Sequence, residues 1–293
     1  MESNISALSA GAAFLTALAL AGPVRAQEAP AAGALSLNVR RIGLEISSTR
    51  VENAEDYQAT SSPVADLTAD GQSVVKGVWD TILEYKADDR RWDNGLYMEY
   101  AKTTLKPAAG PDTKSETADK ILFTSDYAHK IWDVRGMKLG PMVVGEYQTE
   151  FVANAGARRT SILRAKSGVT LFDGAAVKNL YAAAVAEGDM SYNPAIYKAG
   201  AEIGARVEYQ VRDGVKASLD AYGRRYFAFS SFNAADLKYD LSAKAYLDVA
   251  LVDGLALGPY VSYRLAQQRA KGSPAGSNIM IGLSIAYQGL FGL

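Results

Sequence analysis

The feature that most constrains this chain is an alternation of apolar and polar residues over segments of ten or more positions. It is clearest over 237–251, where apolar side chains from Leu237 to Leu251 occupy every second position. A period of two places the apolar and polar sets on opposite faces of a β-strand. Similar segments continue almost to the end of the chain, and helical periodicity is nearly absent after the first segment. We therefore expect an all-β protein.

The expected strands are longer than those of soluble sheets, whose most common length is about 5–6 residues. A tilted strand needs about 9–11 residues to cross a bilayer. We expect twelve strands, near residues 36–48, 74–86, 92–104, 119–132, 138–151, 160–172, 177–187, 196–210, 215–228, 237–251, 255–268 and 277–289. The segment 177–187 scarcely alternates, and together with the first strand it leaves ten or fourteen strands as alternatives.

The connections between these strands alternate in length. Every second connection is short, as at 87–90 and 134–136, whereas the others are longer and polar, as at 49–73 and 105–118. Asp-Gly pairs at three short connections, after Phe172, after Arg212 and after Val252, predict type I′ hairpins. Short turns on one side and long loops on the other are typical of a transmembrane antiparallel up-and-down β-barrel of the outer membrane. An even number of strands leaves both termini on the periplasmic side.

A soluble β-sandwich is the alternative, since it too has alternating strands. Two features favour the membrane barrel. The polar face carries charge on almost every strand, and aromatic residues gather near strand ends, where interfacial girdles form. The girdle candidates are Tyr85, Trp92, Trp132, Tyr147, Phe151, Tyr197, Tyr209, Phe227 and Tyr287.

The first segment has the pattern of a secretory signal. An Ala/Leu-rich run over 7–21 is followed by Pro23 and then by Val24-Arg25-Ala26, which has the pattern of a signal-peptide cleavage site. The run is shorter than the roughly 18–20 residues of a spanning helix, which disfavours a membrane anchor. The segment contains Glu2 and no basic residue before the run. We expect a signal peptide at 1–26, a short leader at 27–33 and the barrel at 34–293.

Charge and composition exclude several functions. The net charge is −1, so the chain offers no basic stripe for nucleic acid. There is no cysteine and one histidine, His129, which argues against a metal site and against cofactor chemistry at such ligands. His129 shares the alternation of Phe123 and Tyr127, and no nucleophile–base arrangement is evident around it. We therefore expect no metal, no cofactor and no enzymatic activity.

The charged faces would line the lumen if the apolar faces contact lipid. The first five strands give an acidic arc of Glu45, Asp80, Glu84, Glu99, Asp126, Glu146 and Glu150. The later strands give a basic arc of Arg164, Lys166, Lys198, Arg206, Arg224, Lys244 and Arg264. Two such arcs would place a transverse field across the lumen.

Two functions follow from a charged lumen. A field across a narrow water-filled pore can orient a small polar or charged solute, so the leading hypothesis is a narrow passive channel. The alternative is a closed structural or surface-binding barrel, in which opposite charges bridge the lumen. The basic and aromatic segment 224–232 gives a candidate contact with lipopolysaccharide at the outer rim. We expect both the channel and the closed barrel to be surrounded by outer-membrane lipid.

Short motifs also resemble known barrel signatures. The strand opening Trp92-Asp93-Asn94, the segment Lys114–Lys120 and Thr149-Glu150-Phe151 resemble the DUF3078 group of uncharacterised bacterial outer-membrane barrels, over about residues 79–151. The resemblance implies a barrel fold and carries no functional residue. Near the end of the chain, Gly282-x-x-Ile285-x-Tyr287 resembles the C-terminal signal read by the barrel-assembly machinery, although Phe291 is followed by two more residues.

Overall fold

The computed structural model describes residues 33–57, 67, 74–105, 113–153 and 158–293. The expected signal peptide lies outside these residues, as does the expected leader except for its last residue, Gly33. In the part of the chain that is described, no helix is long and apolar enough to cross a membrane.

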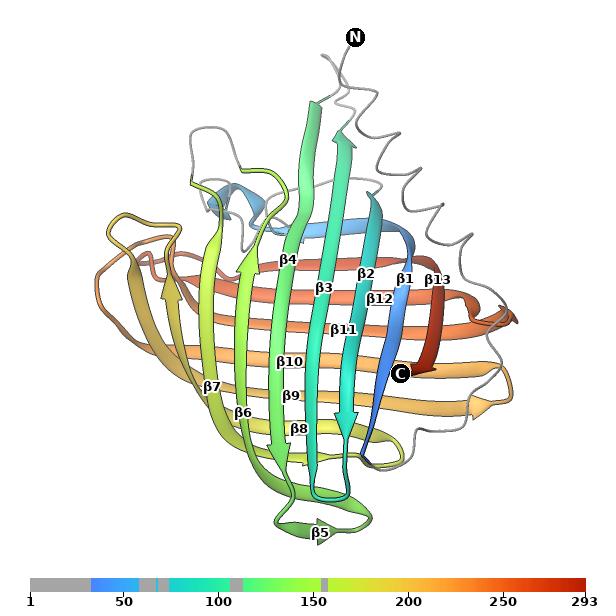
Figure 1. The fold of residues 1–293 in the computed structure, drawn as a ribbon. Coiled ribbons are helices and arrows are strands. Elements are labelled where there is room, and N and C mark those ends of the chain that lie inside the picture. Colours follow the sequence, from blue (N-terminus) through green and yellow to red (C-terminus); the bar gives the residue numbers. More distant parts are fainter. Residues whose placement is uncertain (1–32, 58–66, 68–73, 106–112, 154–157) are drawn as a thin grey trace.

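The described residues form a closed antiparallel β-barrel (Figure 1). Neighbouring strands in the sequence pair with each other, β4 pairs with β6 beyond the short β5, and β13 pairs with β1 to close the ring. The elements are β1 (Ala34–Glu52), η1 (Ala54–Tyr57), β2 (Val74–Lys86), β3 (Arg90–Leu105), β4 (Thr113–His129), β5 (Trp132–Val134), β6 (Met137–Thr149), β7 (Ser161–Phe172), β8 (Val177–Asp189), β9 (Ile196–Arg212), β10 (Val215–Phe229), β11 (Leu237–Val252), β12 (Leu255–Gln268) and β13 (Gly276–Gly292).

The structure confirms the all-β fold class and the expected twelve-strand ring. The segment that scarcely alternates forms a full strand, β8, because both of its neighbours pair with it along its length. Two strand boundaries differ most from the prediction. β1 continues to Glu52 along β13, and β4 begins at Thr113, which is paired with Leu105 of β3. Pairing with the neighbouring strand extends both strands into segments expected to be loops.

The short turns and both ends of the sheet lie at one end of the barrel, here called the turn end; the long connections lie at the other, the loop end. The type I′ prediction is wrong at all three Asp-Gly pairs, because only one residue of each pair has positive φ, namely Asp173, Gly214 and Gly254. The register shifts beside the turns at Gly214 and Gly254, which is the geometry of a turn followed by a bulge. Arg135 and Gly136 both have positive φ, as a type I′ turn requires.

The polarity of the barrel is the inverse of that of a soluble protein. Among the described residues, buried polar and charged side chains outnumber buried hydrophobic ones. Large apolar side chains point outward instead: Ile46, Leu163 and Ile203 are 60%, 54% and 65% exposed. On β1 the exposed Leu44 and Ile46 alternate with the buried Glu45 and Ser47. An apolar exterior around a polar interior is the arrangement of a membrane-spanning barrel.

Exposed aromatic side chains mark both ends of this apolar belt. Trp132 and Tyr209 lie near the turn end, whereas Tyr197 and Phe227 lie near the loop end, and all four are more than half exposed. Aromatic rings at these two levels match the interfacial girdles of transmembrane barrels. The positions of these four residues therefore agree with the girdle expected from the sequence.

A glycine permits two strands to approach closely at the inner wall. A Cβ atom placed on Gly258 of β12 would lie 1.7 Å from the backbone oxygen of Leu247 on β11. No side chain fits at that distance. By contrast, a Cβ on Gly223 of β10 would meet no atom within 4 Å. Because Gly258 has no side chain, the backbones of β11 and β12 can approach each other closely at this point.

We expect Gly258→Ala to lower the free energy of unfolding by about 1–3 kcal/mol, the usual cost of overpacking. Urea unfolding of refolded protein in detergent, followed by tryptophan fluorescence, measures this change. Gly223→Ala is the matched control and should unfold at nearly the wild-type urea concentration. Equal midpoints for the two variants would contradict the close-approach argument.

Candidate functional site

The interior of the barrel contains an elongated cavity of about 710 Å³. Its lining includes Glu84 and Lys216 near the turn end and Lys198 and Asp236 near the loop end. One cavity therefore extends through most of the length of the barrel. Its walls carry many acidic and many basic side chains.

The structure places most of the predicted lumen residues on this cavity. The lining contains Asp80, Glu84, Glu99, Asp126, Glu146, Arg164, Lys166, Lys198, Arg206, Arg224, Lys244 and Arg264. The two remaining candidates are nearly fully buried and are held by neighbours. Glu45 pairs with Lys76 at 2.7 Å. Glu150 accepts hydrogen bonds from the backbone nitrogen and the hydroxyl of Thr160, both at 2.9 Å.

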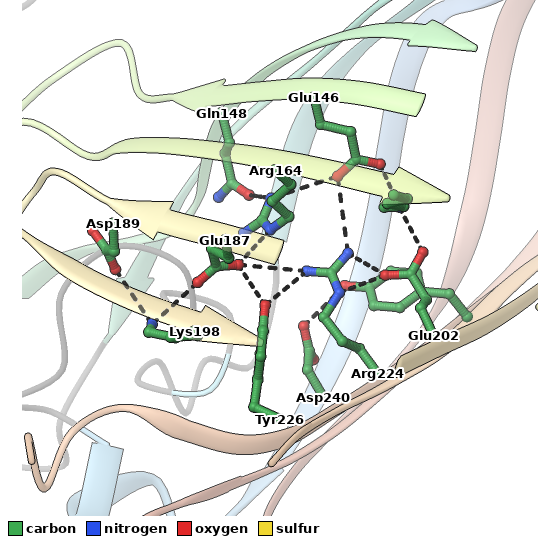
Figure 2. A network of polar contacts seen from close by, with 12 residues as sticks. Glu146, Gln148, Arg164, Glu187, Asp189, Lys198, Glu202, Arg224, Tyr226 and Asp240 are labelled. Atoms are coloured by element: carbon green, nitrogen blue, oxygen red, sulfur yellow. Dashed lines mark hydrogen bonds and ion pairs between the residues drawn. The ribbon is translucent and has the colours of Figure 1, made fainter. Parts of the chain in front are cut away.

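A first group of buried charges follows strands β6 to β10 (Figure 2). We call it the β6–β10 cluster; it consists of Glu146, Arg164, Lys166, Glu187, Lys198, Glu202, Arg224 and Tyr226. Lys166 lies 2.5 Å from Glu146 and 2.5 Å from Glu202. Arg224 also pairs with Glu202, so this carboxylate is shared by two cations. Arg164 lies 2.5 Å from Glu187.

A second group connects opposite parts of the wall. We call it the bridge cluster; it consists of Glu45, Lys76, Tyr97, Glu99, Lys244 and Tyr246. Lys244 of β11 lies 2.9 Å from Glu99 of β3 and donates to the hydroxyl of Tyr97 at 2.7 Å. Five strand pairings separate β3 from β11 around the ring. The ion pair therefore spans the lumen.

A second contact across the lumen lies closer to the turn end. Arg41 of β1 pairs with Asp248 of β11 at 2.7 Å, and its guanidinium lies 3.7 Å from the centroid of the Tyr246 ring. Tyr246 in turn stacks on Tyr260, with ring centroids 5.6 Å apart. These contacts fill the space between β1 and β11. Together with the bridge cluster, they narrow the lumen along this side.

Charges of opposite sign are therefore interleaved in this lumen. Glu146 of the acidic arc contacts Arg164 and Lys166 of the basic arc, and Glu99 contacts Lys244. Pairing of this kind compensates the cost of burying each charge. It also shortens the distance over which the field of either arc extends.

The sequence prediction omitted one residue that organises the β6–β10 cluster. Glu187 of β8 forms ion pairs with Arg164 and Lys198, and it accepts a hydrogen bond from the hydroxyl of Tyr226. It lies near the end of the strand whose alternation was weakest. Val185, Glu187 and Asp189 occupy every second position of β8, and all three are buried. This alternation is the sequence feature from which the inward position of Glu187 could have been predicted.

Buried groups also fix the loop end of the barrel. Burial raises the pKa of the Asp236 carboxyl, although Lys198 lies 3.0 Å away and favours its charged form. Tyr57 of η1 is fully buried, and its hydroxyl donates to the backbone oxygen of Ala266 at 2.8 Å. Gly276 donates its backbone N–H to the same hydroxyl at 2.9 Å. These bonds hold η1 against β12 and β13.

The histidine does not form part of a recognisable catalytic arrangement. Within the described residues, Nδ1 of His129 is buried and has no hydrogen-bond partner. A general base in a nucleophile–base pair needs both a nucleophile within reach and a group that orients the ring. In the same residues, no group of histidine or carboxylate side chains is arranged to hold a metal ion.

Comparison with known proteins finds similarity in structure only. No family model matches the sequence, and no curated protein matches it. The translocator domain of autotransporter NalP from Neisseria meningitidis matches with a TM-score of 0.39 at 9% identity, over 97% of each chain. The outer membrane channel DcaP of Acinetobacter baumannii matches with a TM-score of 0.37 at 11% identity, over 91% of this chain and 100% of that one.

A third match is the COG4313 outer membrane channel from Pseudomonas putida F1. It has a TM-score of 0.38 at 9% identity and covers 90% of this chain and 100% of that one. By their descriptions, two of these structures are outer membrane channels and one is the translocator domain of an autotransporter. The fold of the present chain is defined by its own closed ring of strand pairings.

We expect Glu202→Gln to lower the free energy of unfolding by about 3 kcal/mol or more, because it leaves two buried cations undercompensated. Equilibrium urea titration of the refolded barrel measures the loss. Glu52→Gln is the matched control: its pair with Arg50 is 4.0 Å long with side chains 81% and 62% exposed. Such a surface pair contributes at most about 1 kcal/mol. A Glu202 variant as stable as the control would contradict the role of the cluster.

Proposed function

We propose that this protein is an outer-membrane β-barrel that serves as a narrow passive channel for small polar or charged solutes. The observation that carries the proposal is the single charged cavity, lined by residues from both ends of the barrel. The apolar exterior fits lipid and the polar interior fits water and ions. A twelve-strand ring lies between the filled eight-strand barrels and the open sixteen-strand porins.

The contacts across the lumen set the size of the solute. Lys244 and Glu99 bridge β11 and β3, and Arg41 and Asp248 bridge β1 and β11. A solute has to pass beside these paired side chains. The lumen therefore favours small solutes with hydrogen-bonding or charged groups, which can exchange contacts with the lining.

The same contacts favour the alternative of a closed barrel. Buried ion pairs that span a lumen tie opposite walls together, and a closed interior would leave function to the loop end. The two functions differ in one measurable property, which is whether the barrel conducts ions. Enzymatic activity receives no support from the position of His129 described above.

The loop end offers a surface for lipid headgroups. Phe227 and Phe232 are 67% and 69% exposed. The guanidinium of Arg269 lies 3.7 Å from the ring centroid of Phe229, and that of Arg225 lies 5.8 Å from the ring centroid of Phe227. Basic and aromatic groups side by side suit the anionic headgroup region of a membrane. We propose lipopolysaccharide as the lipid that contacts this rim.

Refolded protein in a planar bilayer should give discrete conductance steps, and Lys244→Ala should raise their size by roughly twofold as the bridge is removed and the bore widens. Lys238→Ala is the matched control on the same strand, because Lys238 is exposed at the loop end. Its conductance should equal that of wild type. Silence from protein shown to be folded by heat-modifiable gel mobility would establish the closed barrel instead.

Ion selectivity tests the charged lining. Asp80 lines the cavity and pairs with Arg40 at 2.7 Å, so Asp80→Ala leaves an uncompensated guanidinium in the lumen. The reversal potential in a KCl gradient should shift toward anions, with a permeability ratio changed by about two- to fivefold, as for one partly solvated charge. Asp133→Ala removes a carboxylate that is 67% exposed in β5 and should leave the potential unchanged. An unchanged potential in the Asp80 variant would count against a conducting lumen at this position.

A further inference from the structure

An unpaired lysine lies in the lumen beside the bridge cluster. Lys120 of β4 lines the cavity and is directly opposite Glu99 of β3 in the antiparallel register. Opposite charges at such positions normally stabilise one another. Within the described residues, however, the ammonium of Lys120 takes part in no hydrogen bond or ion pair. Its Nζ lies 5.6 Å from the centroid of the Tyr97 ring.

The carboxylate opposite Lys120 is occupied by other partners. Glu99 lies 2.9 Å from Lys244 and 3.7 Å from Lys76, and it accepts the hydroxyl of Tyr97 at 2.6 Å. Its charge is thus directed across the lumen and away from its strand neighbour. This arrangement explains why the register partner of Lys120 does not form an ion pair with it.

The neighbour on the other side of Lys120 is also occupied. The register of β4 with β6 ends at Ile121 opposite Thr149, so Glu150 lies at the next position toward the loop end. Both carboxylate oxygens of Glu150 accept hydrogen bonds from Thr160. Glu150 thereby holds the connection between β6 and β7. Neither flanking carboxylate forms an ion pair with Lys120.

A second ammonium group lies close to the same place. Lys244 approaches the ring of Tyr97 to 5.1 Å, so both lysines lie beside one ring. The bridge cluster contains two lysines and two glutamates, whose charges balance. Lys120 adds one positive charge that forms no ion pair with a described side chain. An ammonium that faces the lumen without such a partner is available to a bound anion, and the hydrogen bonds between them would be charge-assisted.

We propose that Lys120 and the bridge cluster form a binding site in the lumen for the carboxylate group of a small monoanion. The inference rests on the proposed channel function and names the class of solute. One excess positive charge suits a monoanion. The ammonium of lysine has three N–H donors and no acceptor, and a carboxylate accepts without donating. The solute binds between the two walls and leaves along the same cavity.

Acetate is the probe for this site, and two measurements test it. The first is the acetate-over-potassium permeability ratio from reversal potentials in potassium acetate gradients. Lys120→Gln should lower this ratio by roughly three- to fivefold, the size expected for one partly solvated charge pair. Lys120→Arg keeps the charge and should retain the ratio. Lys238→Gln is the matched control, because Lys238 is exposed at the loop end and does not line the cavity.

The second measurement does not depend on conduction. Acetate at constant ionic strength, compared with chloride, should raise the unfolding temperature of refolded wild-type protein, since a ligand of the native state stabilises it. Lys120→Gln should lose this shift and Lys238→Gln should keep it. A conducting barrel in which the two glutamine variants behave alike would overturn the site and leave the channel standing. A silent barrel whose acetate shift depends on Lys120 would overturn the channel and leave the site standing.

Discussion

Compensation of buried charge inside a closed sheet is the interaction on which this structure depends. Closing β13 onto β1 removes the inner face of every strand from bulk water, and that face is charged along most of its length. A carboxylate such as Glu202 is tolerable there because Lys166 and Arg224 both contact it. Removing either sign alone would leave the other buried without a partner. The apolar exterior and the charged interior are thus two consequences of one alternating sequence.

The way these charges pair determines the shape of the lumen. In the β6–β10 cluster, pairs form between strands that are near each other in the ring, so the charges stay close to the wall. On the other side, Lys244 reaches Glu99 across five strand pairings. Close approach of β11 and β12 at Gly258 allows the strands there to bend. The result is a lumen that is narrowed by ion pairs and in which the strands of the two walls cross at a steep angle (Figure 1).

Such a lumen separates charges that stabilise the barrel from charges that remain available to a solute. Arg164 and Glu187, for example, form an ion pair and are both buried. Lys120 differs because both neighbouring glutamates serve other partners. A transported ion would meet many paired charges along its path and the unpaired Lys120 beside the bridge cluster. Affinity and passage are compatible only when such sites are few and weak.

The sequence by itself determined the strands and the faces they present. The expected bounds 74–86 and 255–268 are those of β2 and β12, because a period of two and short Gly-containing turns are local properties. Parity also predicted which charges face inward, as for Asp80 and Lys166. Tertiary structure alone decided which charges meet. Lys244 with Glu99 is a pair between residues far apart in the sequence, and Lys120 is unpaired despite an opposite glutamate. Both follow from the bore, the stagger and the tilt of the closed ring, which fix distances across the lumen and have no counterpart in local sequence.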